Sequence, residues 1–316
     1  MFQGKSAQPL APSALYDSDI SAMQSSAYLS MPLSEWQPAL NSSLQTEAIK
    51  ALEQGKIICL PQLPFILTKD EKRYLRSDCV KSGVKSIKYS PVRKTLWGTS
   101  KEEDKSPILA GLLQRYAASA QTLINAIFPG YAPYLSIGNT SFRPVEAKER
   151  VQSARHDDQL LHVDAFPSRP NRGQRILRVF TNIHPNDLPR LWRVGEPFAH
   201  VAARFMPKIP RPLPGSSTLL RLLKITKGKR SLYDHYMLQI HDRMKLDQAY
   251  QQDVSYTTMP FLPGTSWIVF SDQVSHAVVS GQHAMEQTFM LPVAAMAQPD
   301  NSPLRVLENL VGKNLH

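Results

Sequence analysis

Hydrophobic and polar positions change their spacing along the chain near residue 134. Before that point, the clearest series recurs at three- and four-residue steps and runs from Leu109 and Leu112 to Ile124 and Ile127. These steps place the apolar side chains on one face of a helix. The pattern therefore predicts a long amphipathic helix that begins at Pro107, ends at Pro129-Gly130 and packs on a sheet.

Shorter elements are predicted upstream of this helix. A helix is expected over 46–54, a buried strand over 56–60, and a second helix over 68–76 that Thr68 caps. Residues 1–45 are rich in Ser, Ala, Pro and Gln, with only scattered apolar positions. That composition is typical of a weakly structured arm.

After residue 134 the pattern consists of short β-like runs separated by turn signals. These runs are 134–143, 160–166, 175–183, 255–261, 265–270, 276–280 and 287–293. Helical patterns over 217–225 and 232–250 form an insertion at about 200–252. The order predicts an α+β fold, a single domain over 46–316 whose double-stranded β-helix (jelly-roll or cupin-like) core is flanked by helices.

Composition narrows the function classes. Lys and Arg number 37 against 26 Asp and Glu, which gives a net charge of +11 and predicts an acidic partner such as a phosphate, a carboxylate or an anionic membrane. Cys59 and Cys79 are too few for a disulfide framework. No apolar run reaches the ~18 residues that span a bilayer, and residues 1–16 lack the core of a secretory signal, so a cytoplasmic location is expected.

One candidate metal site lies among the β-like runs. His162 and Asp164 are two residues apart in an apolar run, so strand alternation points both side chains to one face. His276 opens a later apolar run. Two histidines and one carboxylate are the facial triad of non-haem Fe(II) oxygenases, which leaves metal positions open for a cosubstrate and O2.

Other interpretations of these residues stay open at the level of sequence. Asp164 could cap a turn while His162 packs in the core, and a second His-x-Asp, His156 to Asp158, lies in a polar stretch typical of a solvated loop. Among other third ligands, His283 and His184 lie in turns and are expected to be exposed. His235 and His241 are six residues apart in the helical insertion, on different helix faces.

Longer stretches around these residues resemble the bacterial Kdo hydroxylase family, over roughly residues 45 to 295. The similar stretches are His162-Val163-Asp164-Ala165-Phe166-Pro167-Ser168-Arg169-Pro170, Arg175 to Ile183, Trp192-Arg193-Val194-Gly195-Glu196-Pro197-Phe198, and Pro263-Gly264-Thr265-Ser266-Trp267 through His276. The resemblance implies an Fe(II)- and 2-oxoglutarate-dependent dioxygenase that uses O2 and hydroxylates C3 of the Kdo sugar on Kdo-lipid A. With such an acidic glycolipid as substrate, we expect peripheral contact with the cytoplasmic face of the inner membrane and no nucleic-acid partner.

Binding 2-oxoglutarate requires a cation for its distal carboxylate, best supplied by arginine. Many relatives place that cation shortly after the second histidine, but this chain has no Arg or Lys between Ala277 and Leu304. Arg178 is the first choice, because it lies between apolar neighbours on its predicted strand, and Arg143 is the second. Asn182 could add a hydrogen bond. Either arginine could instead be an ordinary surface or salt-bridged residue.

Two basic segments are candidates for contact with an acidic glycolipid. Arg169, Arg172 and Arg175 follow the proposed ligands, and with Trp192 and Arg193 they could hold the Kdo carboxylate or lipid A phosphates, Trp192 stacking on a sugar. A second segment places four cations beside leucines. It could lie on an anionic membrane or pack its leucines inward as an ordinary helix. Its members are Leu219, Leu220, Leu222, Leu223, Lys224, Lys227, Lys229 and Arg230.

Three other functions are compatible with the same residues. A 2-oxoglutarate oxygenase could act on nucleic acid or another acidic substrate, although the chain lacks interleaved arginines and aromatics that would stack flipped bases. A zinc hydrolase could use the same three ligands to activate water. If His162, Asp164 and His276 do not converge, the chain would be a non-enzymatic cupin-like binding module.

Overall fold

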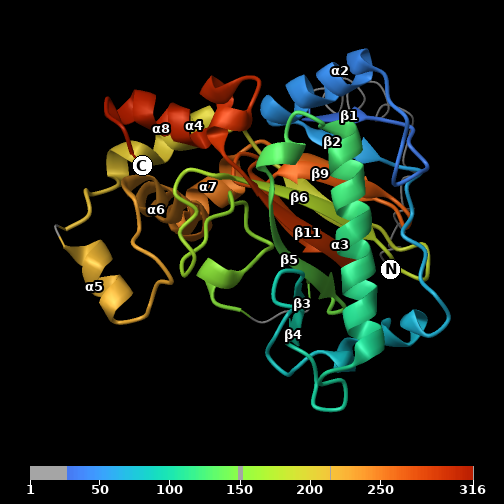
Figure 1. Cartoon of the computed structure of the whole chain (residues 1–316). Helices are drawn as coiled ribbons and strands as arrows, with labels where there is room; N and C mark the ends of the chain where they lie inside the picture. Colours follow the sequence, from blue (N-terminus) through green and yellow to red (C-terminus); the bar gives the residue numbers. More distant parts are fainter. Residues whose placement is uncertain (1–26, 149–151, 214, 316) are drawn as a thin grey trace, which may run out of the picture.

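The computed structural model describes residues 27–148, 152–213 and 215–315, and two β-sheets share a buried cluster at its centre; Figure 1 labels the strands of the larger one. The large sheet has the order β1-β2-β9-β6-β11-β5-β3-β4, and the small sheet the order β10-β7-β8. All pairs are antiparallel except β1 with β2. The strands are β1 (Tyr28–Ser30), β2 (Ile57–Leu60), β3 (Ile87–Ser90), β4 (Thr95–Trp97), β5 (Ser136–Arg143), β6 (Arg175–Asn182), β7 (Arg190–Val194), β8 (Thr257–Phe261), β9 (Ser266–Phe270), β10 (His276–Ser280) and β11 (Ala284–Leu291).

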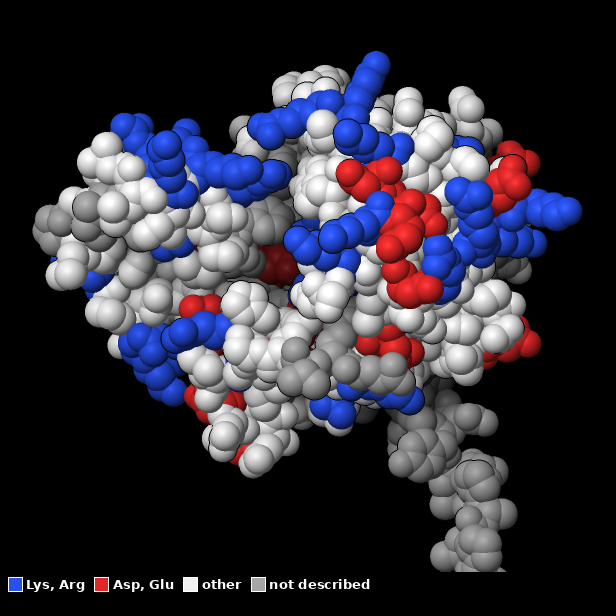
Figure 2. Space-filling view, turned by 90° about the horizontal axis from the view of Figure 1, so that it is seen from below, with Lys and Arg blue, Asp and Glu red and all other residues white. Residues whose placement is uncertain are grey.

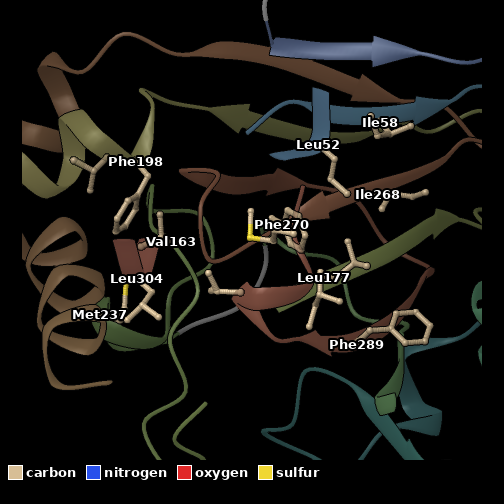
Figure 3. Packing of buried hydrophobic residues seen from close by; sticks show 14 of the residues in the cluster. Leu52, Ile58, Val163, Leu177, Phe198, Met237, Ile268, Phe270, Phe289 and Leu304 are labelled. Atoms are coloured by element: carbon tan, nitrogen blue, oxygen red, sulfur yellow. The ribbon is translucent and has the colours of Figure 1, made fainter. Parts of the chain in front are cut away.

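Both faces of the large sheet are covered, which explains why β9 is buried along its whole length and apolar from Trp267 to Phe270. Ile268 and Phe270 belong to the core cluster that includes residues of α2 (Ser42–Glu53) and α3 (Pro107–Ile127). Figure 3 shows both side chains near Leu52 of α2. Trp267 and Val269, on the alternate face, pack against the small sheet. This arrangement confirms the predicted α+β jelly-roll core.

The predicted long helix is confirmed as α3, which begins after the N-cap Ser106 and carries Pro107 in its first turn. Four helices lie between β7 and β8, within the predicted insertion, and α8 follows the last strand. Their bounds are α4 (Phe198–Phe205), α5 (Ser216–Leu222), α6 (Leu232–Leu246), α7 (Gln248–Asp253) and α8 (Pro303–Val311). Among the described residues, no helix combines the length and the apolar character that crossing a membrane requires.

Some predicted elements differ from the structure. Residues 1–26 of the predicted arm lie outside the described part, but the expectation of weak structure is wrong for 27–45, because β1 pairs with β2 and Met31 is buried. The helix predicted over 68–76 is only a short 3-10 turn, Glu71–Tyr74, and a second 3-10 turn, Ser77–Cys79, follows it. The run 160–166 forms a single bridge at His162 instead of a strand.

A buried ion pair fixes the turn that follows β9. Arg175 and Asp272 are both fully buried, with 2.8 Å between Arg175 Nε and Asp272 Oδ2. The guanidinium also donates to Gln273 Oε1 at 2.6 Å and lies over the Phe270 ring, 3.8 Å from its centroid. The neighbouring residue in this turn, Ser271, accepts a hydrogen bond from the Asp164 backbone N–H at 2.8 Å. The pair therefore supports the segment that carries Asp164.

Replacing Arg175 by methionine is expected to lower the free energy of unfolding by about 3–5 kcal/mol, because Asp272 would stay buried without its partner. Urea unfolding followed by circular dichroism measures this change. The control is Arg305→Met, which removes a half-exposed arginine paired with Glu308 and should cost at most about 1 kcal/mol. Equal losses in the two variants would contradict a special contribution from the buried pair.

Candidate metal centre

Backbone pairing brings the three predicted ligands together. His162 and His276 form an antiparallel bridge, in which His162 N–H donates to His276 O at 3.0 Å and His276 N–H donates to His162 O at 2.8 Å. Directly opposed residues in such a pair present their side chains on the same face. Asp164 lies two residues further on, and one potential ligand atom from each residue lies within 4.8 Å of the others. The alternative of a separate core histidine and turn cap is therefore wrong.

Both imidazoles are held in the tautomer that suits metal binding. His162 Nδ1 lies 2.8 Å from Leu160 O, and His276 Nδ1 lies 2.8 Å from Val274 O. A carbonyl oxygen can only accept, so each Nδ1 carries the hydrogen and each Nε2 keeps its lone pair. Metal-binding histidines commonly use this second hydrogen bond to fix the ring. The two Nε2 atoms and the Asp164 carboxylate are thus the atoms available to hold a metal ion.

The charges of the trio also suit a divalent cation. Burial lowers the pKa of His162, and Lys245 lowers it further; burial is also the main cause of the lowered pKa of His276. Burial raises the pKa of Asp164, but Arg178 and the two imidazoles lower it by more, so the net shift is downward. Neutral imidazoles and an ionised carboxylate are the protonation states in which these groups bind metal. The residues present therefore fit an Fe(II) ion.

Aromatic rings hold the two histidines in place. The Trp192 ring stacks on His276 with centroids 5.0 Å apart, and the His241 ring meets His162 edge-on at 5.4 Å. Trp192 is only 1 % exposed, so the prediction that it stacks on a sugar is wrong; its indole fills the space between the two sheets. The sequence pattern argues against His235 and His241 as ligands of one ion. In the structure, α6 nevertheless places His241 against His162.

Arg178 and Arg143 lie beside the metal trio and share one carboxylate. Arg178 Nη2 is 3.0 Å from Asp164 Oδ2, and Arg178 Nη1 is 2.9 Å from Glu286 Oε1. Arg143 donates to Glu286 Oε2 through Nε at 2.8 Å and also through Nη2. Burial raises the pKa of Glu286, but the two arginines bring it down to about 2. Both predicted anchor residues are thus salt-bridged and close to the site.

These residues line a cavity of about 510 Å³ beside the trio. Lys88 on β3 also lines it, and no described acidic oxygen lies within ion-pair distance of its ammonium group. Burial lowers the pKa of Lys88. The molecule is hollowed on the face seen in Figure 2, with Lys and Arg side chains on both sides of the hollow. The charged residues that line the cavity are five cations and one carboxylate, so an acidic ligand would meet a predominantly basic lining; they are Lys88, Arg143, Arg169, Arg178, Lys227 and Glu286.

Sequence reasoning missed Glu286 and did not single out Lys88 from the basic run 69–94, which it weighed as either a solvated stretch or an anion-facing surface. Glu286 is a single carboxylate inside the apolar β11, where a buried charge is costly without partners, and that signal could have identified it. Lys88 is one member of a long basic run, 69–94, in which nothing in the sequence distinguishes a buried lysine from solvated ones.

Three further predicted residues lie away from the cavity. Asn182 is buried and its amide donates to Leu188 O and Phe261 O, so its predicted contact with the cosubstrate is wrong. Arg175 is enclosed with Asp272 and does not reach substrate. Arg193 lies on the opposite face of β7 from Trp192 and covers the ring of Tyr256.

Arg169 and Arg172 are exposed, and Arg169 lines the cavity. The remaining candidate histidines are outside the trio. His156 lies exposed in a 3-10 turn and contacts Ser153 Oγ. His283 is buried instead of exposed, stacked on Phe142.

Comparisons with known proteins agree with this geometry. Residues 35–314 match the family model described as 3-deoxy-D-manno-oct-2-ulosonic acid (Kdo) hydroxylase. The chain belongs to the Kdo hydroxylase family. The family predicted from the sequence is confirmed, and with it the class of Fe(II)- and 2-oxoglutarate-dependent dioxygenases. No match was found among curated protein sequences.

Solved structures of the Kdo hydroxylase KdoO are similar to this chain over nearly their whole length. The complex with α-ketoglutarate and Fe(III) is 44% identical, with a TM-score of 0.88, and the match covers 92% of this chain and 97% of that one. The apo structure is 45% identical, with a TM-score of 0.89 and the same coverage. The cobalt(II) complex is 45% identical, with a TM-score of 0.88, and the match covers 91% and 97% of the two chains.

Replacing His162, Asp164 or His276 by alanine is expected to weaken metal binding by at least about 100-fold, since even residues that only orient ligands contribute 10–100-fold. Calorimetric titration with Co(II) under anaerobic conditions measures the affinity, and thermal unfolding checks the fold. His156→Ala, in the second His-x-Asp, is the matched control and should bind as the unmodified protein does. Unchanged affinity in any one trio variant would remove that residue from the site.

Proposed function

We propose that this protein is an Fe(II)- and 2-oxoglutarate-dependent hydroxylase that adds a hydroxyl group at C3 of the Kdo sugar on Kdo-lipid A. The observation that carries the proposal is the convergence of His162, Asp164 and His276 in a chain of the Kdo hydroxylase family. Bound iron with 2-oxoglutarate and O2 would supply the oxidation of an unactivated C–H bond, which no side chain can perform. The chain supplies the three ligands, their protonation states and a buried setting.

Arg178 and Arg143 would bind the distal carboxylate of 2-oxoglutarate. Arg178 reaches Asp164, so its guanidinium lies next to the residues that would hold the metal, and both arginines line the cavity. Glu286 holds the two guanidinium groups in position before the cosubstrate arrives. Lys88, on the same cavity wall, offers a further cation without a partner of its own among the described acidic residues. A dicarboxylate entering this cavity would therefore meet preorganised donors.

Arg178→Ala is expected to raise the 2-oxoglutarate concentration needed for half-maximal activity by about 30- to 100-fold, because truncating one partner of a buried charge pair typically costs about 2–3 kcal/mol or more. The 2-oxoglutarate requirement of Arg178→Lys should lie between those of the unmodified protein and Arg178→Ala, since a lysine keeps the charge but loses the forked geometry. Succinate release at varied 2-oxoglutarate gives the requirement, and Co(II) titration serves as the control for metal binding. An unchanged requirement would transfer the role to Arg143.

The proposed acceptor is an acidic glycolipid, and the exposed basic residues at the cavity suit its carboxylate and phosphate groups. Arg169 and Lys227 line the cavity mouth, and Arg172 is exposed nearby in the same loop. Lipid A is anchored in a membrane, so the protein would act at the cytoplasmic face of the inner membrane as a peripheral enzyme. The net charge of +11 favours contact with such a surface.

Mass analysis of Kdo-lipid A after incubation with the protein, Fe(II), 2-oxoglutarate and O2 tests the reaction and the substrate together. A gain of one oxygen atom on the Kdo unit is expected, with one succinate formed per oxygen inserted. His276→Ala and omission of 2-oxoglutarate are the controls, and both should leave the glycolipid unchanged. Succinate release without any change in Kdo-lipid A would show that the substrate is a different molecule.

A further inference from the structure

The segment between α4 and α6 exposes an unusual amount of apolar surface. We call residues 210–230, without the undescribed residue 214, the α5 arm; α5 lies at the edge of the molecule in Figure 1. Four large aliphatic side chains of the arm are more than half exposed: Leu213 77 %, Leu222 68 %, Leu223 60 % and Ile225 54 %. Clustered exposed apolar side chains mark interaction surfaces, whereas single ones are common. The alternative of leucines packed inward does not hold for Leu222 and Leu223.

The same arm is strongly basic. Residues 210–230 contain no Asp or Glu and no aromatic residue. The cations alternate with the exposed aliphatic residues along the sequence, as in segments that lie in a membrane interface. The six cations are Arg211, Arg221, Lys224, Lys227, Lys229 and Arg230.

Hydrogen bonds tie the arm to the loop that follows the metal ligands. The Lys227 backbone N–H donates to Ser168 O at 2.9 Å, and Arg230 Nη2 donates to Pro167 O at 2.5 Å. Lys227 also lines the 510 Å³ cavity together with Arg178. Any large partner that covers the arm therefore lies next to the mouth of this cavity.

We propose that the α5 arm docks the protein on an anionic phospholipid surface, with Leu213, Leu222, Leu223 and Ile225 entering the interface and the cations contacting lipid phosphates. A nucleic acid would call for aromatic stacking groups, which the arm lacks. A protein interface would disfavour so many lysines. Docking here deepens the proposed function, since it would hold the cavity mouth close to the headgroup of a membrane-anchored glycolipid.

Co-sedimentation with vesicles tests the docking. Vesicles of phosphatidylglycerol and phosphatidylethanolamine should bind the full chain, and vesicles of phosphatidylcholine should bind it at least about tenfold more weakly. The double variant Leu222→Ser, Leu223→Ser should lose about tenfold in affinity, because two exposed aliphatic side chains no longer insert. The matched control is Ile66→Ser with Leu188→Ser, which alters two aliphatic residues 71 % and 56 % exposed elsewhere.

Several outcomes would overturn the proposal. These are no binding to phosphatidylglycerol vesicles, equal binding by the double variant and the control, or a change in oligomeric state in the double variant alone, which would make the arm an interface between copies. Activity provides a separate readout: the double variant should act normally on detergent-dispersed Kdo-lipid A and less on Kdo-lipid A in vesicles. If neither the unmodified protein nor its variants hydroxylate Kdo, but vesicle binding still depends on the α5 arm, then docking by the arm is supported and the proposed substrate is wrong.

Discussion

The two backbone hydrogen bonds between His162 and His276 are the interaction on which the site depends. They join segments more than one hundred residues apart and force both imidazoles onto one face. Each ring is then fixed through Nδ1 by a carbonyl two residues earlier in its own chain segment. Asp164 is held separately, by Ser271 in the turn that Arg175 and Asp272 support. Ligand geometry is thus set by backbone and buried pairs, before any metal contributes.

Strand alternation predicted the shared face of His162 and Asp164 correctly, although their segment makes only one bridge. Exposure was predicted less well. Arg175 and Trp192 resemble surface-loop residues in sequence, yet tertiary packing encloses both. Whether a charged residue is buried depends on a partner far away in sequence, here Asp272, and no local pattern encodes that pairing.

The helical insertion between β7 and β8 also has contacts that no local sequence pattern predicts. Periodicity predicts its helical stretches over 217–225 and 232–250 but not α4, and it does not say which part of the core a helix approaches. His241 on α6 reaches His162, while the leucines at the end of α5 remain in solvent. The position of α6 beside His162 and the exposure of α5 both depend on how the insertion packs against the rest of the fold, which the sequence pattern does not encode.

The segment after His276 lacks a cation, and β11, which follows it, instead carries a glutamate, Glu286, that pairs with two arginines. This strand lies between β5 and β6, and it places Glu286 where it meets Arg143 from one neighbour and Arg178 from the other. Two arginines and one glutamate have a net charge of +1, the charge a single arginine would supply. Because Glu286 keeps both guanidinium groups paired, neither is left as an isolated buried charge when the cavity holds no cosubstrate. In the proposed function, the arrangement would provide an anion site while avoiding the desolvation cost of an unpartnered arginine.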